Sequence, residues 1–396
     1  MEEVLIIGAL RTAVGKLGGA LKDVPVEDLA AAVIRGVVDR SGLDPRQIDQ
    51  VILGQAKQSS DSPNLARLAA LMADVPTEVP AYTVHRQCGS GLQSMINAAH
   101  EIRCGDASIV LAGGAESMST APYYLRSARY GYGAGNGELL DPNTESQPRS
   151  QPVDRYGHLT MGLTAESLAE RYAITREEQD LFTLNSQEKA YAAIEGGRFR
   201  DEILPYEING KRQTVRFGVD EHPRRTTLDQ LSALKPAFKP GGTVTAGNSS
   251  GRNDGAAALV VTSGSRVREL GVRPIARIVS YGTAGVSPEI MGIGPVPATR
   301  LALARAGLKL DDLDLVELNE AFAAQSLAVI KELVIDPGRV NVNGGAIALG
   351  HPIGCSGARI LVTLLYEMRR RRARYGLATL CIAGGQGIAM VVENLD

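Results

Sequence analysis

The chain has 396 residues, of which 44% are hydrophobic and 22% are charged. This composition is typical of a globular protein with two or three domains or one large fused core. A net charge of −2 provides no general attraction to nucleic acid or to an anionic membrane, and an aromatic content of 4% argues against stacking platforms for bases. We therefore expect neither nucleic acid nor a membrane as a partner.

Cysteine usage and the N-terminus indicate the compartment. No C-x-x-C pair occurs, and so few cysteines in a chain of this length do not indicate a disulfide framework; they are Cys88, Cys104, Cys355 and Cys381. The first residues carry neither the basic region nor the long apolar region of a signal peptide, and no run approaches the ~18 apolar residues of a membrane span. We expect a cytoplasmic protein.

An internal repeat organises the chain. Residues 41–53 resemble residues 306–318, residues 84–91 resemble a Gly-rich turn that ends at residues 355–357, and residues 110–114 resemble residues 381–385. Three matches in the same order indicate duplicated halves. In each half strands alternate with helices, which predicts an α/β fold with central sheets covered by helices.

The stretch from about Thr120 to Ser249 has no counterpart in the second half. It contains a polar segment rich in Gly and Pro, residues 131–152, and one strongly helical run, residues 164–195. Within that run, residues 175–178 (Thr-Arg-Glu-Glu) have the pattern of a capping box. We interpret this stretch as an insertion in the first half that lies over a site as a lid.

Cys88 is the first candidate catalytic residue. It is followed by Gly89-Ser90-Gly91 and then by apolar residues at helical spacing, which predicts a strand-to-helix turn with Cys88 at the helix N-terminus. Unpaired N–H groups and the helix dipole at that position stabilise a thiolate and can hold an oxyanion. The alternative is a buried cysteine at a helix start with a packing role only.

His351 and Cys381 extend the candidate site. His351 lies in a turn rich in Gly and Pro, and an imidazole whose reference pKa is near neutrality is suited to deprotonate a thiol. Because the halves are duplicated, His351 and Cys88 would approach from equivalent turns as a base and a nucleophile. Cys381 follows an apolar strand, where core packing is the simpler interpretation. If two cysteines and one histidine converge at strand ends, one thiol can hold an acyl group while the other moves a proton.

Four further patterns bear on the function. Asn319 and Glu320 lie between an apolar strand and an apolar helix, where they cap the helix or, in a cleft, position a water against an oxyanion. Residues 247–251 match G-x-S-x-G, but a strand at 256–261 is expected after them in place of the helix that a serine hydrolase needs. The arginine run 369–372 is expected to be a solvated helix end. The five His residues show no ligand spacing, so we predict no metal site.

Along essentially its whole length the chain resembles the thiolase family. The motifs that carry the resemblance are residues 87–91 (QCGSG), 112–119 (AGGAESMS), 247–256, 319–322 (NEAF), 350–354 (GHPIG) and 381–385. The resemblance implies a duplicated five-layer αβαβα fold with an inserted loop domain. The corresponding division is an N-terminal half at 1–119 completed by 253–272, a CoA-binding loop domain at 120–252, and a C-terminal half at 273–396.

The resemblance also implies the function and the roles of the site residues. It implies thiolase activity, in which an acyl group is transferred between Cys88 and acetyl-CoA or CoA, condensing two acetyl-CoA or cleaving a 3-oxoacyl-CoA. By this resemblance His351 activates Cys88, Cys381 is the second acid/base, and Asn319 holds a water in an oxyanion hole. The backbone N–H groups of Cys88 and Ala383 would form the other oxyanion hole. A β-ketoacyl synthase-like enzyme on the same fold is the alternative.

By the same resemblance, CoA is a substrate and product, and no other cofactor is needed. The CoA groove would be lined by Met161, Arg224, Phe238, Ala246, Ser250, Ala321 and Phe322, and the family expectation is a homo-oligomer, a dimer or a homotetramer. Some positions depart from the family pattern. Thr160 stands directly before Met161, where many acetoacetyl-CoA-specific members carry His, and Arg252 replaces a usual apolar residue.

Overall fold

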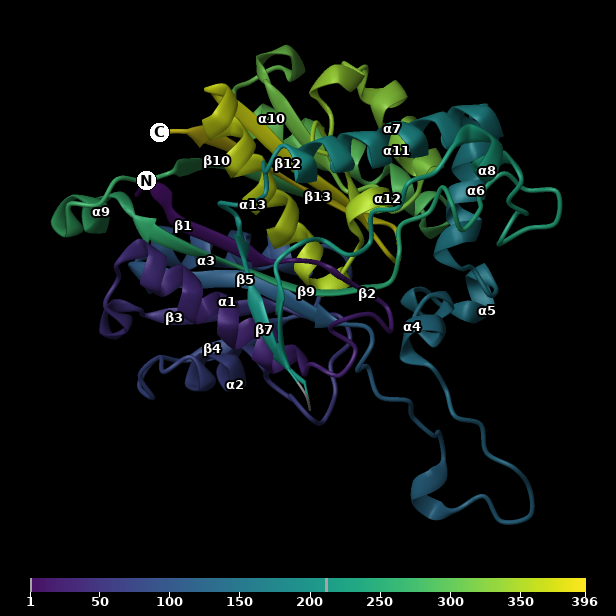
Figure 1. Cartoon of the computed structure of the whole chain (residues 1–396), viewed down its shortest axis with the longest axis horizontal. Helices are drawn as coiled ribbons and strands as arrows, with labels where there is room; N and C mark the ends of the chain where they lie inside the picture. Colours follow the sequence, from purple (N-terminus) through teal and green to yellow (C-terminus); the bar gives the residue numbers. More distant parts are fainter. Residues whose placement is uncertain (1, 211–212) are drawn as a thin grey trace.

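The computed structural model describes residues 2–210 and 213–396 and has a mixed sheet in two halves (Figure 1). The first half contains, in spatial order, β1 (Val4–Thr12), β9 (Asn253–Ser263), β5 (Ile109–Ser117), β3 (Gln50–Gly54) and β4 (Ala81–Val84). The second contains β10 (Ala276–Gly285), β13 (Gln386–Asn394), β12 (Tyr375–Ile382) and β11 (Leu315–Leu318). The halves join where β1 pairs antiparallel with β10.

The strand pairing repeats between the halves. In the first half β3 runs parallel to β5, and β9 pairs antiparallel with both β5 and β1. In the second half β11 runs parallel to β12, and β13 pairs antiparallel with both β12 and β10. Even β4 has an equivalent, because Val340 forms a parallel bridge to Val316 of β11. The predicted α/β fold class and the duplication are therefore confirmed.

Helices cover both outer faces of this arrangement and fill its centre. One outer layer contains α1 (Val26–Ser41) and α2 (Leu65–Met72), the central layer contains α3 (Ser90–Cys104) and α13 (Ile353–Arg371), and the other outer layer contains α10 (Pro295–Ala306) and α11 (Ala323–Leu333). Three buried apolar clusters lie between these layers. The largest side chains of the central cluster come from both halves, so neither half buries its core alone.

The contact between α3 and α13 depends on two glycines. A Cβ on Gly91 would lie 2.8 Å from Ala358 N, and a Cβ on Gly357 would lie 2.3 Å from Leu92 N. The neighbouring atoms belong to the backbone and cannot rotate away. These two glycines therefore set how closely the two helix N-termini approach, and the site lies beside those N-termini.

The segment between β5 and β9 carries additional elements around the sheet. They are α4 (Pro142–Glu145), α5 (Val153–Tyr156), α6 (Met161–Arg171), α7 (Arg176–Glu195), β6 (Ile203–Leu204), β7 (Tyr206–Asn209), β8 (Thr214–Phe217) and α8 (Leu228–Ser232). The remaining short elements of the described chain are β2 (Gly15–Lys16), α9 (Gly264–Leu270) and α12 (Ala346–Leu349). Residues 120–140 extend away from the body at the lower right of Figure 1.

The predicted helical run at 164–195 is wrong in one respect, because it consists of two helices. The chain leaves α6 at Tyr172, and Ala173 adopts a positive φ of 49°. The predicted capping box then begins α7: the Thr175 side chain accepts from Glu178 N, and Glu178 accepts in return from Thr175 N. The capping box that the sequence indicated at Thr175 thus marks the start of a second helix.

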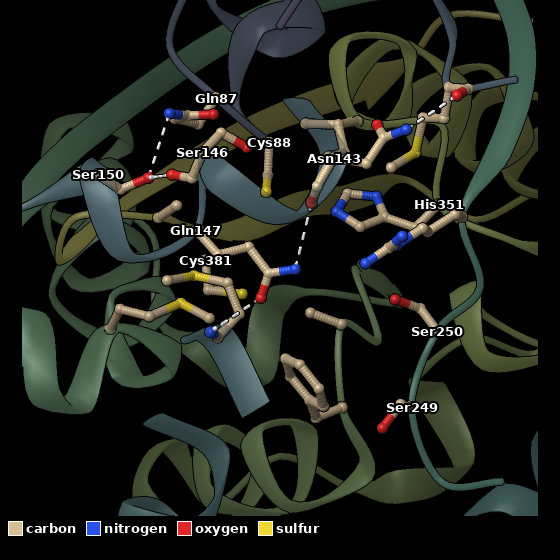
Figure 2. A pocket seen from close by; sticks show the side chains of 18 of the residues that line it. Gln87, Cys88, Asn143, Ser146, Gln147, Ser150, Ser249, Ser250, His351 and Cys381 are labelled. Atoms are coloured by element: carbon tan, nitrogen blue, oxygen red, sulfur yellow. Dashed lines mark hydrogen bonds between the residues drawn. The ribbon is translucent and has the colours of Figure 1, made fainter. Parts of the chain in front are cut away.

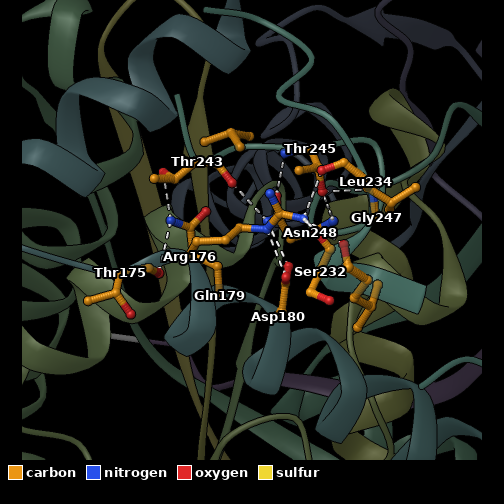
Figure 3. A network of polar contacts seen from close by, with 12 residues as sticks. Thr175, Arg176, Gln179, Asp180, Ser232, Leu234, Thr243, Thr245, Gly247 and Asn248 are labelled. Atoms are coloured by element: carbon orange, nitrogen blue, oxygen red, sulfur yellow. Dashed lines mark hydrogen bonds and ion pairs between the residues drawn. The ribbon is translucent and has the colours of Figure 1, made fainter. Parts of the chain in front are cut away.

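A polar network joins α7 to residues 243–251, which lead to the site (Figure 3). Asn248 accepts from Thr245 N and donates to Asp180 Oδ1 at 3.2 Å. Arg176 pairs with Asp180 at 2.7 Å and also donates to the carbonyl groups of Leu231 and Leu234. Because these groups are buried or half-buried and mutually satisfied, they fix residues 243–251 against α7.

No helix of the described chain is long and apolar enough to cross a membrane. The division into 1–119 with 253–272, 120–252 and 273–396 stays a prediction.

Candidate active site

A cavity of about 190 Å³ lies between the two halves and the inserted segment. Cys88, His351, Cys381 and Ala383 contribute to its wall, and Figure 2 shows both thiols and the imidazole facing the same space. The inserted segment supplies much of the remaining wall, including Asn143, Ser146, Gln147, Ser150 and Met161. Three predicted catalytic side chains, far apart in the sequence, are thus brought together.

The turn before α3 holds Cys88. Ser90 Oγ accepts from Arg86 N at 2.8 Å and donates to the carbonyl of Gln87 at 2.6 Å, which closes a tight turn around the cysteine. Gln87 adopts a positive φ of 46°, a conformation that is uncommon for a side chain with a Cβ and that recurs at functional sites. Since α3 begins at Ser90, Cys88 lies at a strand-to-helix turn as predicted.

Opposing effects act on the Cys88 thiol. Burial raises its pKa, whereas the backbone N–H groups of Ala383 and of Cys88 itself and the positive charge of Lys57 lower it. The two N–H groups lie against the sulfur from two different halves of the fold. They are thus arranged to stabilise negative charge that develops on or beside the sulfur.

His351 is held in one orientation from both ends. Its backbone N–H donates to Asn253 Oδ1 at 2.9 Å, and its Nδ1 lies 2.5 Å from Ser356 Oγ. The Ser356 hydroxyl donates its only proton to the carbonyl of Pro352 at 2.8 Å. Nδ1 is therefore the donor to Ser356, and Nε2 is the unprotonated nitrogen, the one that can accept a proton.

Burial and the charge of Arg359 lower the pKa of His351 to about 4. The imidazole is therefore neutral at physiological pH, as a base must be. Cys381 lies at the end of β12 and is fully buried, and burial together with the Cys88 charge raises its pKa. A thiol that stays protonated beside a nucleophile can donate a proton.

Asn319 does not line the cavity, although it was predicted as catalytic. It is fully buried, its backbone N–H donates to Thr379 O, and its side-chain Oδ1 and Nδ2 have no partner among the described residues. Its neighbour Glu320 accepts from Ser186, Asn341 and the backbone of Ile347. Glu320 thereby fixes the segment, while the Asn319 amide keeps its hydrogen-bonding capacity for a water or a ligand.

The residues predicted to bind CoA divide into two groups. Met161, Phe238, Ser250, Ala321 and Phe322 line the cavity, and the two phenylalanine rings meet edge to face. Arg224 and Ala246 do not. Arg224 lines a neighbouring surface hollow that shares Arg252 with the cavity, and its guanidinium donates to the carbonyl of Gly247 at 3.2 Å.

Sequence reasoning missed Lys57 and Glu116. Lys57 lines the cavity, and the buried Glu116 accepts from the backbone N–H groups of Ala56, Lys57 and Gly354. Lys57 follows β3 by three residues and Glu116 lies near the carboxyl end of β5, and these two strands run parallel and end at the same edge. The sequence could have indicated both residues, because polar residues at the carboxyl ends of buried parallel strands often lie at a functional site.

The geometry excludes the serine-hydrolase alternative. Residues 247–251 are followed by β9, without the helix of a serine-hydrolase elbow, and Ser249 Oγ donates to the carbonyl of Thr245. Cys355 is buried on α13 outside the cavity wall, and burial raises its pKa to about 12. The exposed arginines at the end of α13 pair with Glu367 and Asp396 and form the expected solvated helix end.

Comparisons with known proteins agree with this fold and site. Residues 4–265 match the family "Thiolase, N-terminal domain" and residues 272–394 match "Thiolase, C-terminal domain". The chain is 54% identical to an acetyl-CoA acetyltransferase of Pseudomonas aeruginosa over 396 residues, covering 100% of both, and 50% identical to one of Escherichia coli, again covering 100% of both.

Solved structures give the same result. The crystal structure of the Bacillus anthracis acetyl-CoA acetyltransferase superimposes with a TM-score of 0.97 at 49% identity, covering 100% of this chain and 99% of that chain. Human mitochondrial 3-ketoacyl-CoA thiolase in complex with CoA superimposes with a TM-score of 0.95 at 46% identity, covering 100% and 98%. The chain belongs to the thiolase family. It is an enzyme, an acyltransferase of the thiolase type, which favours the first sequence hypothesis over the synthase-like alternative.

Proposed function

We propose that this thiolase transfers acyl groups between CoA thioesters through an acyl group on Cys88. The supporting observation is the convergence of the Cys88 sulfur, the His351 imidazole and the Cys381 thiol on one cavity. Several relatives of the chain are named acetyl-CoA acetyltransferases, and one similar structure is a complex with CoA. Acetyl-CoA, CoA and 3-oxoacyl-CoA are therefore the substrates and products that we assign to this chain.

The cleavage direction follows from the protonation states. His351 Nε2 takes the proton of Cys88, and the thiolate attacks the 3-oxo carbon. The C2–C3 bond breaks, Cys381 protonates the departing acetyl-CoA enolate at C2, and the shortened acyl group remains on Cys88. The Cys381 thiolate then takes the proton of the CoA thiol, whose sulfur takes the acyl group, and the Cys88 sulfur leaves with the proton held on His351. Condensation is the same sequence in reverse.

The oxyanions formed in these steps need donors. The N–H groups of Cys88 and Ala383 lie against the Cys88 sulfur and would hold the oxygen of the tetrahedral adduct. A water held by the buried Asn319 amide, together with His351, would stabilise the enolate oxygen. Removing one such donor typically costs about 10²–10³ in kcat.

CoA would enter between apolar and hydroxyl side chains of the inserted segment and of the second half. Met161, Phe238 and Phe322 offer an apolar channel for the pantetheine arm, and Ser250 offers a hydrogen bond. Arg224 lies in the adjoining hollow, where its guanidinium suits a phosphate. We further propose a homo-oligomer in the cytoplasm; four free cysteines fit a reducing compartment.

The size of the cavity bears on chain length. At about 190 Å³ the cavity is smaller than the about 300–1,000 Å³ of a typical ligand pocket, which favours a short acyl group. The experiment is CoA-dependent cleavage of acetoacetyl-CoA and of 3-oxohexadecanoyl-CoA, with Cys88→Ser and the exposed-thiol control Cys104→Ser. We expect the short substrate to be preferred, Cys88→Ser to lose at least about 10³-fold in kcat, and Cys104→Ser to match the wild type. Failure of the wild type to cleave either substrate would refute the proposal.

A further inference from the structure

Lys57 is a cationic wall residue of the Cys88 cavity that the mechanism above does not use. It follows β3 by three residues and lines the cavity together with Cys88 and Gln87. Only 8% of the residue is exposed. Its Nζ donates to the carbonyl of Pro142 at 3.1 Å and to the hydroxyl of Ser146, both in the inserted segment.

The charge of Lys57 is not neutralised by a contacting carboxylate. Among the described residues, no carboxylate oxygen lies within 4.0 Å of its Nζ. The two nearby acids are engaged elsewhere, since Glu116 accepts three backbone N–H groups and Asp141 pairs with Arg252 at 3.5 Å and caps α4. A buried ammonium that bonds only to neutral oxygens is costly, and an anionic ligand would offset that cost.

Lys57 also lies on the side of Cys88 that is opposite to the proposed entrance of CoA. Figure 2 shows its partner Ser146, with Gln87 and Ser150, on one side of the cavity, and Ser249 with Ser250 on the opposite side. CoA is proposed to enter on the Ser250 side. The Ser146 side is therefore where the acyl group on Cys88 would extend.

The wall on that side is polar. Asn143 and Gln147 contribute amides to the cavity wall. An apolar acyl chain would have to desolvate these groups and Lys57 without replacing their hydrogen bonds, which is unfavourable. An acyl group that ends in an oxygen anion would instead form a charge-assisted hydrogen bond with the Lys57 ammonium, which has three donors and uses two.

We propose that Lys57 forms an acyl subsite for chains that end in a carboxylate, so that the preferred substrate is a short 3-oxoacyl-CoA with a terminal carboxylate. This inference rests on the proposed thiolase function. In the reaction, the Cys88 thiolate attacks the 3-oxo carbon, acetyl-CoA leaves with a proton from Cys381, and a dicarboxylic half-thioester remains on Cys88 with its free carboxylate on Lys57. CoA then removes this acyl group, and no oxidant or further reactant is required.

The test compares two six-carbon substrates that differ at the chain end, 3-oxoadipyl-CoA with a terminal carboxylate and 3-oxohexanoyl-CoA without one. The quantity measured is the ratio of their kcat/KM values in CoA-dependent cleavage. For the wild type we expect a ratio of at least about ten in favour of the carboxylate, and we expect Lys57→Met to lower that ratio at least about tenfold. Lys189→Met is the matched control, because Lys189 Nζ also donates to a backbone carbonyl, that of Val340, outside the cavity wall.

Cleavage of acetoacetyl-CoA distinguishes failure of the Lys57 subsite from failure of the thiolase function. If the wild type cleaves acetoacetyl-CoA but prefers 3-oxohexanoyl-CoA over 3-oxoadipyl-CoA, the subsite is refuted while the thiolase function stands. Equal losses on both six-carbon substrates in Lys57→Met would also refute it and would assign Lys57 to Cys88 or to the 141–146 segment. If acetoacetyl-CoA and both longer substrates remain uncleaved, both proposals are wrong.

Discussion

At the scale of single residues, the site depends on the residues that hydrogen-bond to the reacting groups as much as on those groups themselves. Ser356 determines which nitrogen of His351 carries the proton, because the Ser356 hydroxyl donates to Pro352 and must accept from Nδ1. We expect Ser356→Ala to lower kcat on the order of tenfold with little change in KM, since binding is untouched while the base loses its fixed tautomer. Ser356→Thr, which keeps the hydroxyl, should recover most of the rate. A Ser356→Ala variant with wild-type kcat would contradict this role.

The pKa of His351 also predicts how stability depends on pH. Its folded pKa of about 4 lies below the ordinary 6.5, so the unfolded chain takes up this proton first as the pH falls. The contribution is fully present above pH 6.5 and is lost toward pH 4, and by about pH 5 the loss is about 2 kcal/mol. The fall in Tm from about pH 7.5 to about pH 5 should thus be smaller in His351→Asn than in the wild type. His158→Asn, at an exposed position, is the control; an equal fall in all three proteins would contradict the pKa.

At the scale of elements, the close approach of the N-termini of α3 and α13 brings Cys88 and His351 near each other. A Cβ on Gly357 would meet the Leu92 backbone at 2.3 Å, so Gly357→Ala must separate these helices. Overpacking of this kind costs about 1–3 kcal/mol, and the displacement should lower kcat as well because it separates Cys88 from His351. The control is Gly285→Ala, whose Cβ would meet nothing closer than 3.9 Å. The measurements are chemical unfolding and acetoacetyl-CoA cleavage, and equal behaviour of the two variants would contradict the argument.

At the scale of the whole molecule, the extended segment 120–140 is the most conspicuous surface. It exposes large apolar side chains, with Tyr130 at 94%, Leu139 at 69% and Tyr123 at 61% exposed, which is unusual for a surface that faces only water. We expect this segment to bury itself against other copies of the chain. Leu139→Asp should therefore reduce the mass in sedimentation or light scattering by about half, whereas Leu395→Asp should not. A wild type that is already a monomer would contradict the proposed oligomer.

The sequence allowed much of this architecture to be predicted, for identifiable reasons. The repeat of strands and turns located both halves. The Gly-rich turns located Cys88 and His351, because Gly and Pro mark tight turns by their local backbone preferences. The break between α6 and α7 was missed because the residues on both sides of it favour a helix, and only the cap at Thr175 marks the boundary. Lys57 was missed because a lysine after a strand is common in any sequence. Only the tertiary structure shows that its ammonium contacts Pro142 and Ser146 and lines the cavity beside Cys88.

The measurement that tests the central claim most directly is the location of the acyl group in the covalent intermediate. The enzyme would be incubated with acetyl-CoA, quenched in acid, digested and analysed by mass spectrometry. We predict one acetyl group on the peptide that contains Cys88, none on that peptide in Cys88→Ser, and retention of the Cys88 adduct in Cys381→Ala, which can accept an acyl group but not complete the condensation. An acetyl group on Cys381 in place of Cys88, or no adduct on either thiol, would contradict the account.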